Sequence, residues 1–191
     1  MRINVGLLSK GGSKIITMDA FGSLKEIGDL TREELLGLLE DASLNWLTHD
    51  GLWFQAVEER HGTDQASLCN QKAIAQYSEI EAKRIMRRFN LNDGGISSLM
   101  QALKFRMYHL INKQDFIEVS ETRCIFRMVE CRVQQARKKK GLPDYPCKPV
   151  GIKEYTHFAM TIDPRIRTRC VACPPDTHPN DFWCAWEFTL E

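Results

Sequence analysis

The sequence predicts an α+β protein in which N-terminal helices pack with an antiparallel sheet of about four strands, in the order ααα-ββ-α-ββ. The first observation behind this prediction is that apolar residues recur every three or four positions in the first part of the chain, as on one face of a helix. The second is that the period changes after about residue 112. Short runs of β-branched and aromatic residues then alternate with turn residues, a pattern typical of strands.

The first helix is expected to begin at Thr31, because Thr31 and Glu34 form the capping-box pattern before an apolar run. The helical pattern continues past Asp50-Gly51 to His61-Gly62, where the glycine suits a helix C-cap. Gly51 either kinks this long helix or divides it in two.

Two more helices are expected in the first part of the chain. Thr63 or Asp64 caps the second, which runs to about Phe89. The turn sequence Asn92-Asp93-Gly94-Gly95 separates it from a third helix over about residues 96–111.

In the last third of the chain, residues 116–119 and 124–131 predict an antiparallel hairpin. Two more strands are expected at about 166–173 and 182–190, with one helix over 150–162 between the two pairs. The basic run Arg137–Lys140 is interpreted as part of a loop.

The chain divides into an irregular extension over residues 1–28, a helical region over 29–112 and a cysteine-rich α+β region over 113–191. The last two are expected to form one compact unit. Within the extension, residues 14–18 are expected to form a short strand.

The composition is that of a globular protein, with 43% hydrophobic and 27% charged residues. A formal net charge of +1 gives no reason to expect nucleic acid or an anionic membrane surface as a partner. No apolar run approaches the roughly 20 residues of a membrane helix, and the N-terminus has no secretory signal pattern. We therefore expect a cytoplasmic protein, and the sequence leaves open whether it forms a homodimer.

Five of the seven cysteines lie between positions 131 and 184. Cys170 and Cys173 have the Cys-x-x-Cys spacing that lets two sulfurs converge on one ion. Cys147 precedes the helix expected at 150–162, where free backbone amides favour a thiolate. In a reducing compartment, clustered cysteines bind metal or catalyse more often than they form disulfides. The sequence predicts a metal or reactive-thiol centre, with inert packing of the cysteines as the alternative.

The cysteine-rich region also resembles a known family. The stretches Pro146-Cys-Lys-Pro-Val-Gly-Ile-Lys-Glu-Tyr, Cys170-x-x-Cys-Pro-Pro-Asp-x-His-Pro and Trp183-Cys-Ala-Trp-Glu-Phe resemble a family of prokaryotic cytosolic proteins, largely of unknown function. That family is grouped with the L-2-amino-thiazoline-4-carboxylic acid hydrolase-like proteins. Together with Asn45-Trp-Leu-x-His-Asp-Gly-Leu-Trp-Phe, the resemblance covers about residues 29–191. It implies a hydrolase-like protein acting on C–N or C–S bonds of a small heterocycle.

More remotely, the C-terminal half is similar to the four-vinyl reductase domain, a small-molecule-binding α+β module. Those domains carry a cysteine before a helix, one in a following strand and one in the last strand, positions that Cys147, Cys170 and Cys184 match. The resemblance implies a zinc-type site beside a ligand pocket. We therefore expect zinc to be held by Cys147, Cys170, Cys173 and Cys184, with Cys131 in reserve.

Two further sets of residues are candidates for function. Asp50 interrupts an apolar helical pattern, and Trp53 and Glu58 follow it closely enough to line the same polar pocket. Capping at a helix break is the competing interpretation of Asp50. His178 stands between Cys173 and Cys184, so it is a candidate metal ligand or general base.

The leading hypothesis is a cytoplasmic zinc-binding protein with a pocket for a small organic molecule, with hydrolase activity left open. The first alternative is a thiol hydrolase of a small heterocyclic or amide substrate, with Cys147 as nucleophile, His178 as base and Asp50 as a further catalytic candidate. A non-catalytic ligand-binding or sensor module and an iron–sulfur protein are the remaining alternatives.

Overall fold

The structure is a computed structural model that describes residues 25–191. The strand expected at residues 14–18 and most of the expected extension lie outside the described residues. Residues 38–191 form one compact unit, and the described residues before them belong to a separate unit.

The start of the first helix is confirmed. A short 3-10 turn, η2 (Ile27–Asp29), precedes α1 (Arg32–His61). Thr31 Oγ1 accepts a hydrogen bond from the Glu34 amide at 3.2 Å, and Glu34 Oε2 accepts one from the Thr31 amide at 2.8 Å. These reciprocal bonds satisfy donors that a helix start leaves free. Gly51 does not divide α1, which is a single helix from Arg32 to His61.

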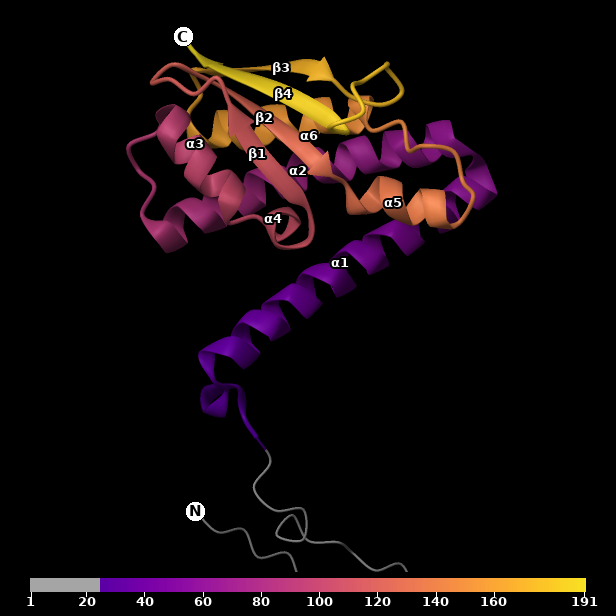
Figure 1. Ribbon diagram of the computed structural model, residues 1–191, viewed down its shortest axis with the longest axis horizontal. Helices are drawn as coiled ribbons and strands as arrows, with labels where there is room; N and C mark the ends of the chain where they lie inside the picture. Colours follow the sequence, from indigo (N-terminus) through magenta and orange to yellow (C-terminus); the bar gives the residue numbers. More distant parts are fainter. Residues whose placement is uncertain (1–24) are drawn as a thin grey trace, which may run out of the picture. The chain divides into compact units, whose positions relative to one another are not determined.

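The predicted α+β class and the antiparallel sheet are confirmed. Four strands, β1 (Lys113–Ile117), β2 (Arg123–Glu130), β3 (Ile166–Ala172) and β4 (Cys184–Leu190), pair antiparallel in the order β1-β2-β4-β3 (Figure 1). Helix α6 (Lys148–Ile162) packs against β3, and α2 (Thr63–Phe89) packs along α6. The sheet and α2 therefore sandwich α6.

The expected third helix is two helices, α3 (Gly95–Lys104) and α4 (Met107–Ile111). The sequence period did not reveal the break because Leu103 and Met107 keep the spacing of four across it. Arg106 takes an extended backbone conformation at the break. Its side chain is buried and forms ion pairs with Glu81 and Glu154. We therefore attribute the break between α3 and α4 to these ion pairs of Arg106 with residues distant in sequence.

The basic run is not a loop. Residues Arg132–Lys139 form α5, and Arg137, Lys138 and Lys139 occupy its last turn. Basic side chains there suit the negative end of the helix dipole. Gln134 and Arg137 are buried, so a helix with almost no apolar residues is held by polar contacts.

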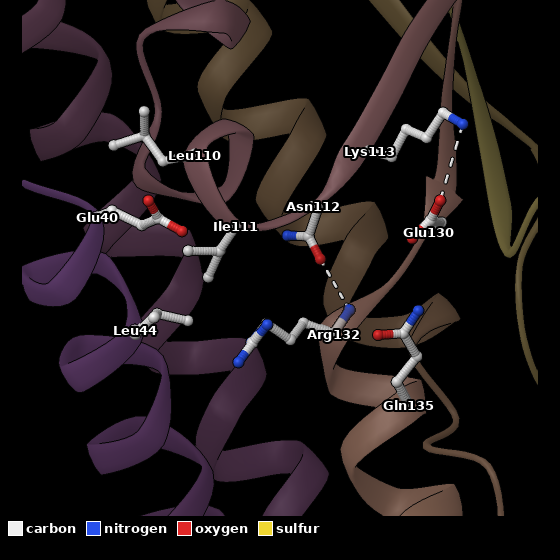
Figure 2. A pocket seen from close by; sticks show the side chains of 9 residues that line it. All are labelled: Glu40, Leu44, Leu110, Ile111, Asn112, Lys113, Glu130, Arg132 and Gln135. Carbon is white, nitrogen blue, oxygen red and sulfur yellow. Dashed lines mark hydrogen bonds and ion pairs between the residues drawn. The ribbon is translucent and has the colours of Figure 1, made fainter. Parts of the chain in front are cut away.

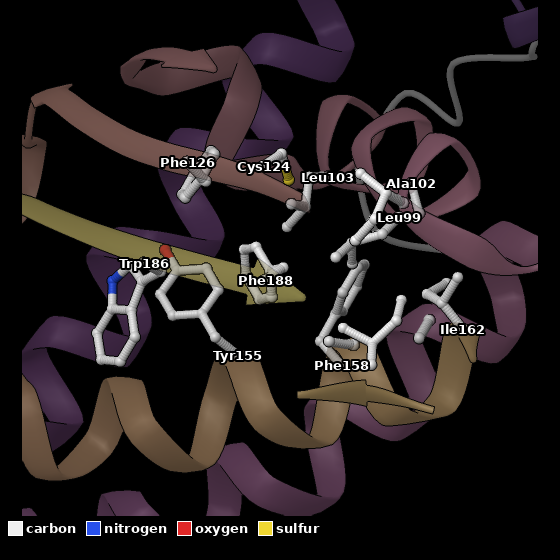
Figure 3. Close-up of a cluster of buried hydrophobic side chains, with 14 of the residues drawn as sticks. Leu99, Ala102, Leu103, Cys124, Phe126, Tyr155, Phe158, Ile162, Trp186 and Phe188 are labelled. Carbon is white, nitrogen blue, oxygen red and sulfur yellow. The ribbon is translucent and has the colours of Figure 1, made fainter. Parts of the chain in front are cut away.

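The main hydrophobic core fills the space between the sheet and the helices on its inner face (Figure 3). Leu99 from α3, Phe158 from α6 and Phe188 from β4 are each fully buried there. On the opposite face of the sheet, Glu187 lies between Arg123 and Arg169 and forms an ion pair with each. Apolar residues in alternate strand positions thus face the helices, while charged ones face outward.

Candidate functional site

The principal cavity has a volume of about 400 Å³. Its walls come from α1, α2, α4, α5, α6 and the ends of β2 and β4. The lining is mostly apolar and aromatic, with a few thiols and carboxyls. A concave, largely apolar space with a small number of polar groups is typical of small-molecule sites.

Four cysteines line this cavity: Cys131, Cys147, Cys173 and Cys184. They come from four places in the chain. Cys131 is the N-cap residue of α5, Cys147 that of α6, Cys173 follows β3, and Cys184 begins β4. All are free thiols. The fold therefore gathers sulfurs that lie up to 53 positions apart in the sequence.

The nearby thiols of Cys147 and Cys184, together with burial, raise the pKa of Cys173 above its usual range. Burial raises the pKa of Cys131, with a further contribution from Cys147 and Cys184. Cys131 and Cys173 therefore resist ionisation, because burial and neighbouring sulfurs disfavour a thiolate there. We call these four residues the thiol cluster.

Hydrogen bonds fix the position of Cys147. The buried side chain of Gln134 donates from Nε2 to Cys147 Sγ at 3.1 Å and to the Tyr145 carbonyl at 2.8 Å, while its Oε1 accepts from the Tyr145 amide. The Lys148 amide donates to the Pro174 carbonyl at 2.8 Å, which ties the start of α6 to the residue after Cys173. These two connections hold Cys147 and Cys173 together.

The donor chemistry of the thiol cluster fits zinc, because thiolates are preferred zinc ligands and four of them make a closed structural site. Within residues 25–191, no group of three or more His, Cys, Asp or Glu side chains has the arrangement of a metal shell.

The expected site residues are only partly brought together. Cys170, an expected ligand, lies on β3 and is absent from the cavity lining, whereas the reserve residue Cys131 is part of it. His178 is likewise absent from the lining; it lies in the loop before β4, with its Nδ1 2.8 Å from the Pro179 carbonyl oxygen and its ring near Trp183.

Of the three residues expected in a polar pocket, Asp50 lines the cavity and the other two do not. Trp53 is 63% exposed. Glu58 forms a two-oxygen ion pair with Arg137, at 3.0 and 3.2 Å, and this contact lowers the pKa of Glu58. Since Arg137 itself lines the cavity, Glu58 neutralises a positive charge in the wall.

Carboxyl groups from two helices line the cavity: Asp50 on α1 and Glu154 on α6. Asp50 is reached by solvent, yet the surrounding protein raises its pKa by desolvation. Glu154 is 9% exposed, and burial raises its pKa despite the opposing effect of Arg106. The negative charge of Asp50 raises it further. Both groups therefore hold their protons more firmly than a carboxyl in water.

The buried guanidinium of Arg106 forms ion pairs with two carboxylates, one of which is Glu154. Arg106 Nε lies 2.8 Å from Glu81 Oε2, and Arg106 Nη1 lies 2.7 Å from Glu154 Oε1. Glu154 Oε1 and Arg106 Nη2 are nevertheless buried without a hydrogen-bond partner. The Arg106–Glu154 contact is thus an ion pair in which Glu154 Oε1 and Arg106 Nη2 still lack hydrogen-bond partners.

Trp186 also lines the cavity with an unused polar atom. The residue is 1% exposed, and its indole N–H has no hydrogen-bond partner. Figure 3 shows the indole nitrogen on the side of the ring turned away from Phe188. Gly151 makes room for this ring, because a Cβ there would meet Trp186 Cζ2 at 2.5 Å.

A second, more polar pocket of about 370 Å³ lies beside the first and shares Leu44, Asn112 and Arg132 with it (Figure 2). Some of its polar groups contact one another. Asn112 Oδ1 accepts from the Arg132 amide at 2.8 Å, and Lys113 pairs with Glu130 at 3.7 Å.

Sequence reasoning missed Gln134, Tyr145 and Glu154 as site residues. One signal was available for Glu154, a charged residue between Val150 and Tyr155 on the inner side of the helix. Nothing in the sequence marks Gln134, because its partners are the backbone of Tyr145 and the sulfur of Cys147.

Comparison with known proteins gives the family. The family described as "Family of unknown function (DUF6125)" matches residues 27–190. The chain belongs to this family. No curated protein and no solved structure matches the chain. Among the helices of residues 25–191, none combines the length and apolar character that crossing a membrane requires.

Proposed function

We propose that this DUF6125 member is a cytoplasmic protein that binds a small organic molecule in the principal cavity, beside a zinc ion held by the thiol cluster. The observation that carries this proposal is that four cysteines, several aromatic rings and two carboxyls line one cavity of about 400 Å³. Cysteines that serve only as small core residues need not gather around a cavity that solvent can enter.

In this proposal Cys147, Cys173 and Cys184 hold the zinc, and Cys131 is the fourth ligand. This set replaces Cys170 with Cys131, because Cys131 lines the cavity and Cys170 does not. Bound to four thiolates, zinc would be structural and would link the starts of α5, α6 and β4. With three thiolates and an open position it would supply Lewis-acid chemistry to the cavity. The resemblance to hydrolase-like proteins favours this second role.

The test is metal content, measured by plasma mass spectrometry on tag-free protein purified without chelator. We expect about one zinc per chain and its loss in Cys173→Ser. Cys131→Ser should lower the zinc content or affinity, whereas Cys170→Ser should leave both close to the parent values. Cys69→Ser is the matched control, because Cys69 is exposed on α2. A fully metallated Cys173→Ser protein would contradict the ligand set.

A second candidate function, a thiol hydrolase, is favoured by one observation. Cys147 lies at the N-terminus of α6, lines the cavity and accepts a hydrogen bond from Gln134. The start of a helix favours negative charge, and this bond orients the sulfur. His178 is absent from the lining, so the base in this candidate is Asp50 or Glu154.

Alkylation distinguishes the two candidates. A free nucleophilic Cys147 reacts rapidly with iodoacetamide at pH 6 in the untreated protein, and Cys147→Ser removes that reaction. Cysteines that hold zinc become reactive only after a chelator is added. Rapid modification of Cys147 without chelator, in a protein free of zinc, would favour the hydrolase over the zinc site.

A further inference from the structure

The charged groups around the principal cavity differ in whether they have partners. Arg137 is neutralised by Glu58, and Arg106 is shared between Glu81 and Glu154. Two basic residues in the lining, Arg132 and Lys140, have exposed side chains, so solvent screens their charge. Asp50 is exposed as well, but unlike Arg137 and Glu154 it has no charged side-chain partner among residues 25–191.

Within residues 25–191 the Asp50 carboxyl has no side-chain hydrogen bond or ion pair. Glu154 Oε1 lies 2.7 Å from Arg106 Nη1 but has no hydrogen-bond donor. Their pKa values are raised chiefly because the protein removes water from them. A ligand that donates hydrogen bonds and carries positive charge would compensate for this desolvation.

An independent observation points to the same ligand. The indole N–H of Trp186 is a donor buried in the cavity wall with no acceptor. An unsatisfied buried donor costs about 1–3 kcal/mol, and it gains a partner if the ligand carries an acceptor. The rings of Phe54, Tyr108, Tyr145 and Tyr155 also line the cavity. Aromatic faces attract cations as well as apolar groups.

We propose that the ligand of the principal cavity is a compact organic cation, an amine or amidine with an apolar body and a hydrogen-bond acceptor. Its cationic group binds Asp50 and Glu154, and its acceptor binds the indole N–H of Trp186. This inference rests on the proposed function, since it specifies the class of molecule that the cavity takes.

Three probes of nearly equal size separate charge from shape: phenethylamine (cation), 2-phenylethanol (neutral) and phenylacetate (anion). Their binding to the full chain is measured by ligand-observed NMR and calorimetry. We expect phenethylamine to bind at least about tenfold more tightly than either of the others. If the exposed Arg132 and Lys140 decide selectivity instead, phenylacetate binds best and the inference is wrong.

Variants test the residues. Asp50→Asn should weaken phenethylamine binding about tenfold and leave 2-phenylethanol binding unchanged. Glu59→Gln is the control, because Glu59 is an exposed carboxylate on the same helix that does not line the cavity. Glu154→Gln should have the same effect as Asp50→Asn; Asp50→Asn decides the question if loss of the Arg106 partner prevents folding. Unchanged selectivity in Asp50→Asn would overturn the inference.

The role of Trp186 has its own readout. The chain has four tryptophans, so its nitrogen-15 spectrum shows at most four indole N–H signals, of which Trp186→Phe identifies one. Phenylalanine amide, which adds a carbonyl acceptor to phenethylamine, should shift that signal downfield, whereas phenethylamine should not. An unaffected signal at saturation would remove Trp186 from the proposal.

The binding results distinguish failure of this inference from failure of the proposed small-molecule function. If all three probes bind equally well, the cavity takes small molecules but does not select a cation, and only this inference fails. If none of the probes binds, the proposed small-molecule function fails with it. The zinc measurement is unaffected by either result.

Discussion

The two halves of α6 lie in different surroundings. The second half, with Phe158 and Ile162, packs into the main core between α3 and the sheet, where apolar neighbours surround both residues. The first half, with Gly151 and Glu154, faces the principal cavity. There, buried polar atoms of Glu154 and Trp186 have no hydrogen-bond partner.

This difference shows where the fold is complete by itself. Buried polar groups in native proteins normally have partners, and exceptions concentrate at functional positions. The core half of α6 needs nothing from outside the chain, whereas the cavity half leaves donors and acceptors that a ligand can satisfy. Substitutions in the two halves should therefore affect different properties.

The largest effect is expected in the core. Phe188→Ala removes a fully buried ring from β4 and should lower the free energy of unfolding by about 3–5 kcal/mol. Urea unfolding measures the change, and Val171→Ala at an exposed position of β3 should change stability by less than about 0.5 kcal/mol. Equal losses of unfolding free energy in the two variants would mean that Phe188 does not lie in the core.

A smaller loss is expected at the contact between Gly151 and Trp186. In Gly151→Ala the new methyl group meets the indole ring, and such overpacking costs about 1–3 kcal/mol. The displaced ring should also change its fluorescence and weaken phenethylamine binding. Gly51→Ala, with open space around the new methyl group, should instead gain up to about 1 kcal/mol.

Asp163, at the end of α6, is a polar group with every partner in place. Its carboxylate accepts hydrogen bonds from the Gly95 amide at 2.9 Å and from the amide and guanidinium of Arg165. These bonds, led by Arg165, hold the pKa of Asp163 well below its usual range. Asp163→Asn should cost about 1.5 kcal/mol at pH 7.

The pH dependence of that loss follows from linkage. The unfolded state binds a proton to this residue more readily, with a pKa of about 3.9, so the stabilisation is present above that pH and is lost as pH falls toward the folded value. Urea unfolding at pH 7 and pH 3 should show parent and variant converging in acid. A constant difference would mean that the charge of Asp163 contributes nothing.

Substitution of Asp50 should change the free energy of unfolding with the opposite pH dependence to that of Asp163, and by the smallest amount of these variants. Because desolvation raises its pKa, the folded state binds the proton more tightly, and stability is lost as pH rises through and above the unfolded value of about 3.9. Asp50→Asn removes that loss. We expect a gain under about 1 kcal/mol at pH 7, limited by solvent screening, and none in acid. A destabilised Asp50→Asn protein would show that Asp50 has a structural partner.

The sequence predicted most of the fold because local signals and burial agreed. The Thr31–Glu34 capping box, the strand pattern of residues 124–131 and the helix expected over residues 150–162 each identified an element. It failed at α5 and at the break before α4. In both places a buried arginine is held by carboxylates far away in the chain, Arg137 by Glu58 and Arg106 by Glu81 and Glu154.

The candidate site was predictable only in part. Residue type and spacing identified the cysteines, and the unusual position of Asp50 within an apolar helix identified one carboxyl in the lining. Spacing could not choose between Cys131 and Cys170. That choice depends on which end of each strand faces the cavity and on the bonds by which Gln134 fixes Cys147.

By itself, therefore, the sequence determined the α+β class, the bounds of most elements and the residue types of the site, because these depend on local propensity and on hydrophobic period. Only the tertiary structure decided which thiols lie together, which carboxyls have partners, and that Trp186 has none. Those properties depend on distances between groups remote in the chain. Packing of the sheet, α1, α5 and α6 fixes these distances, and no local pattern encodes them.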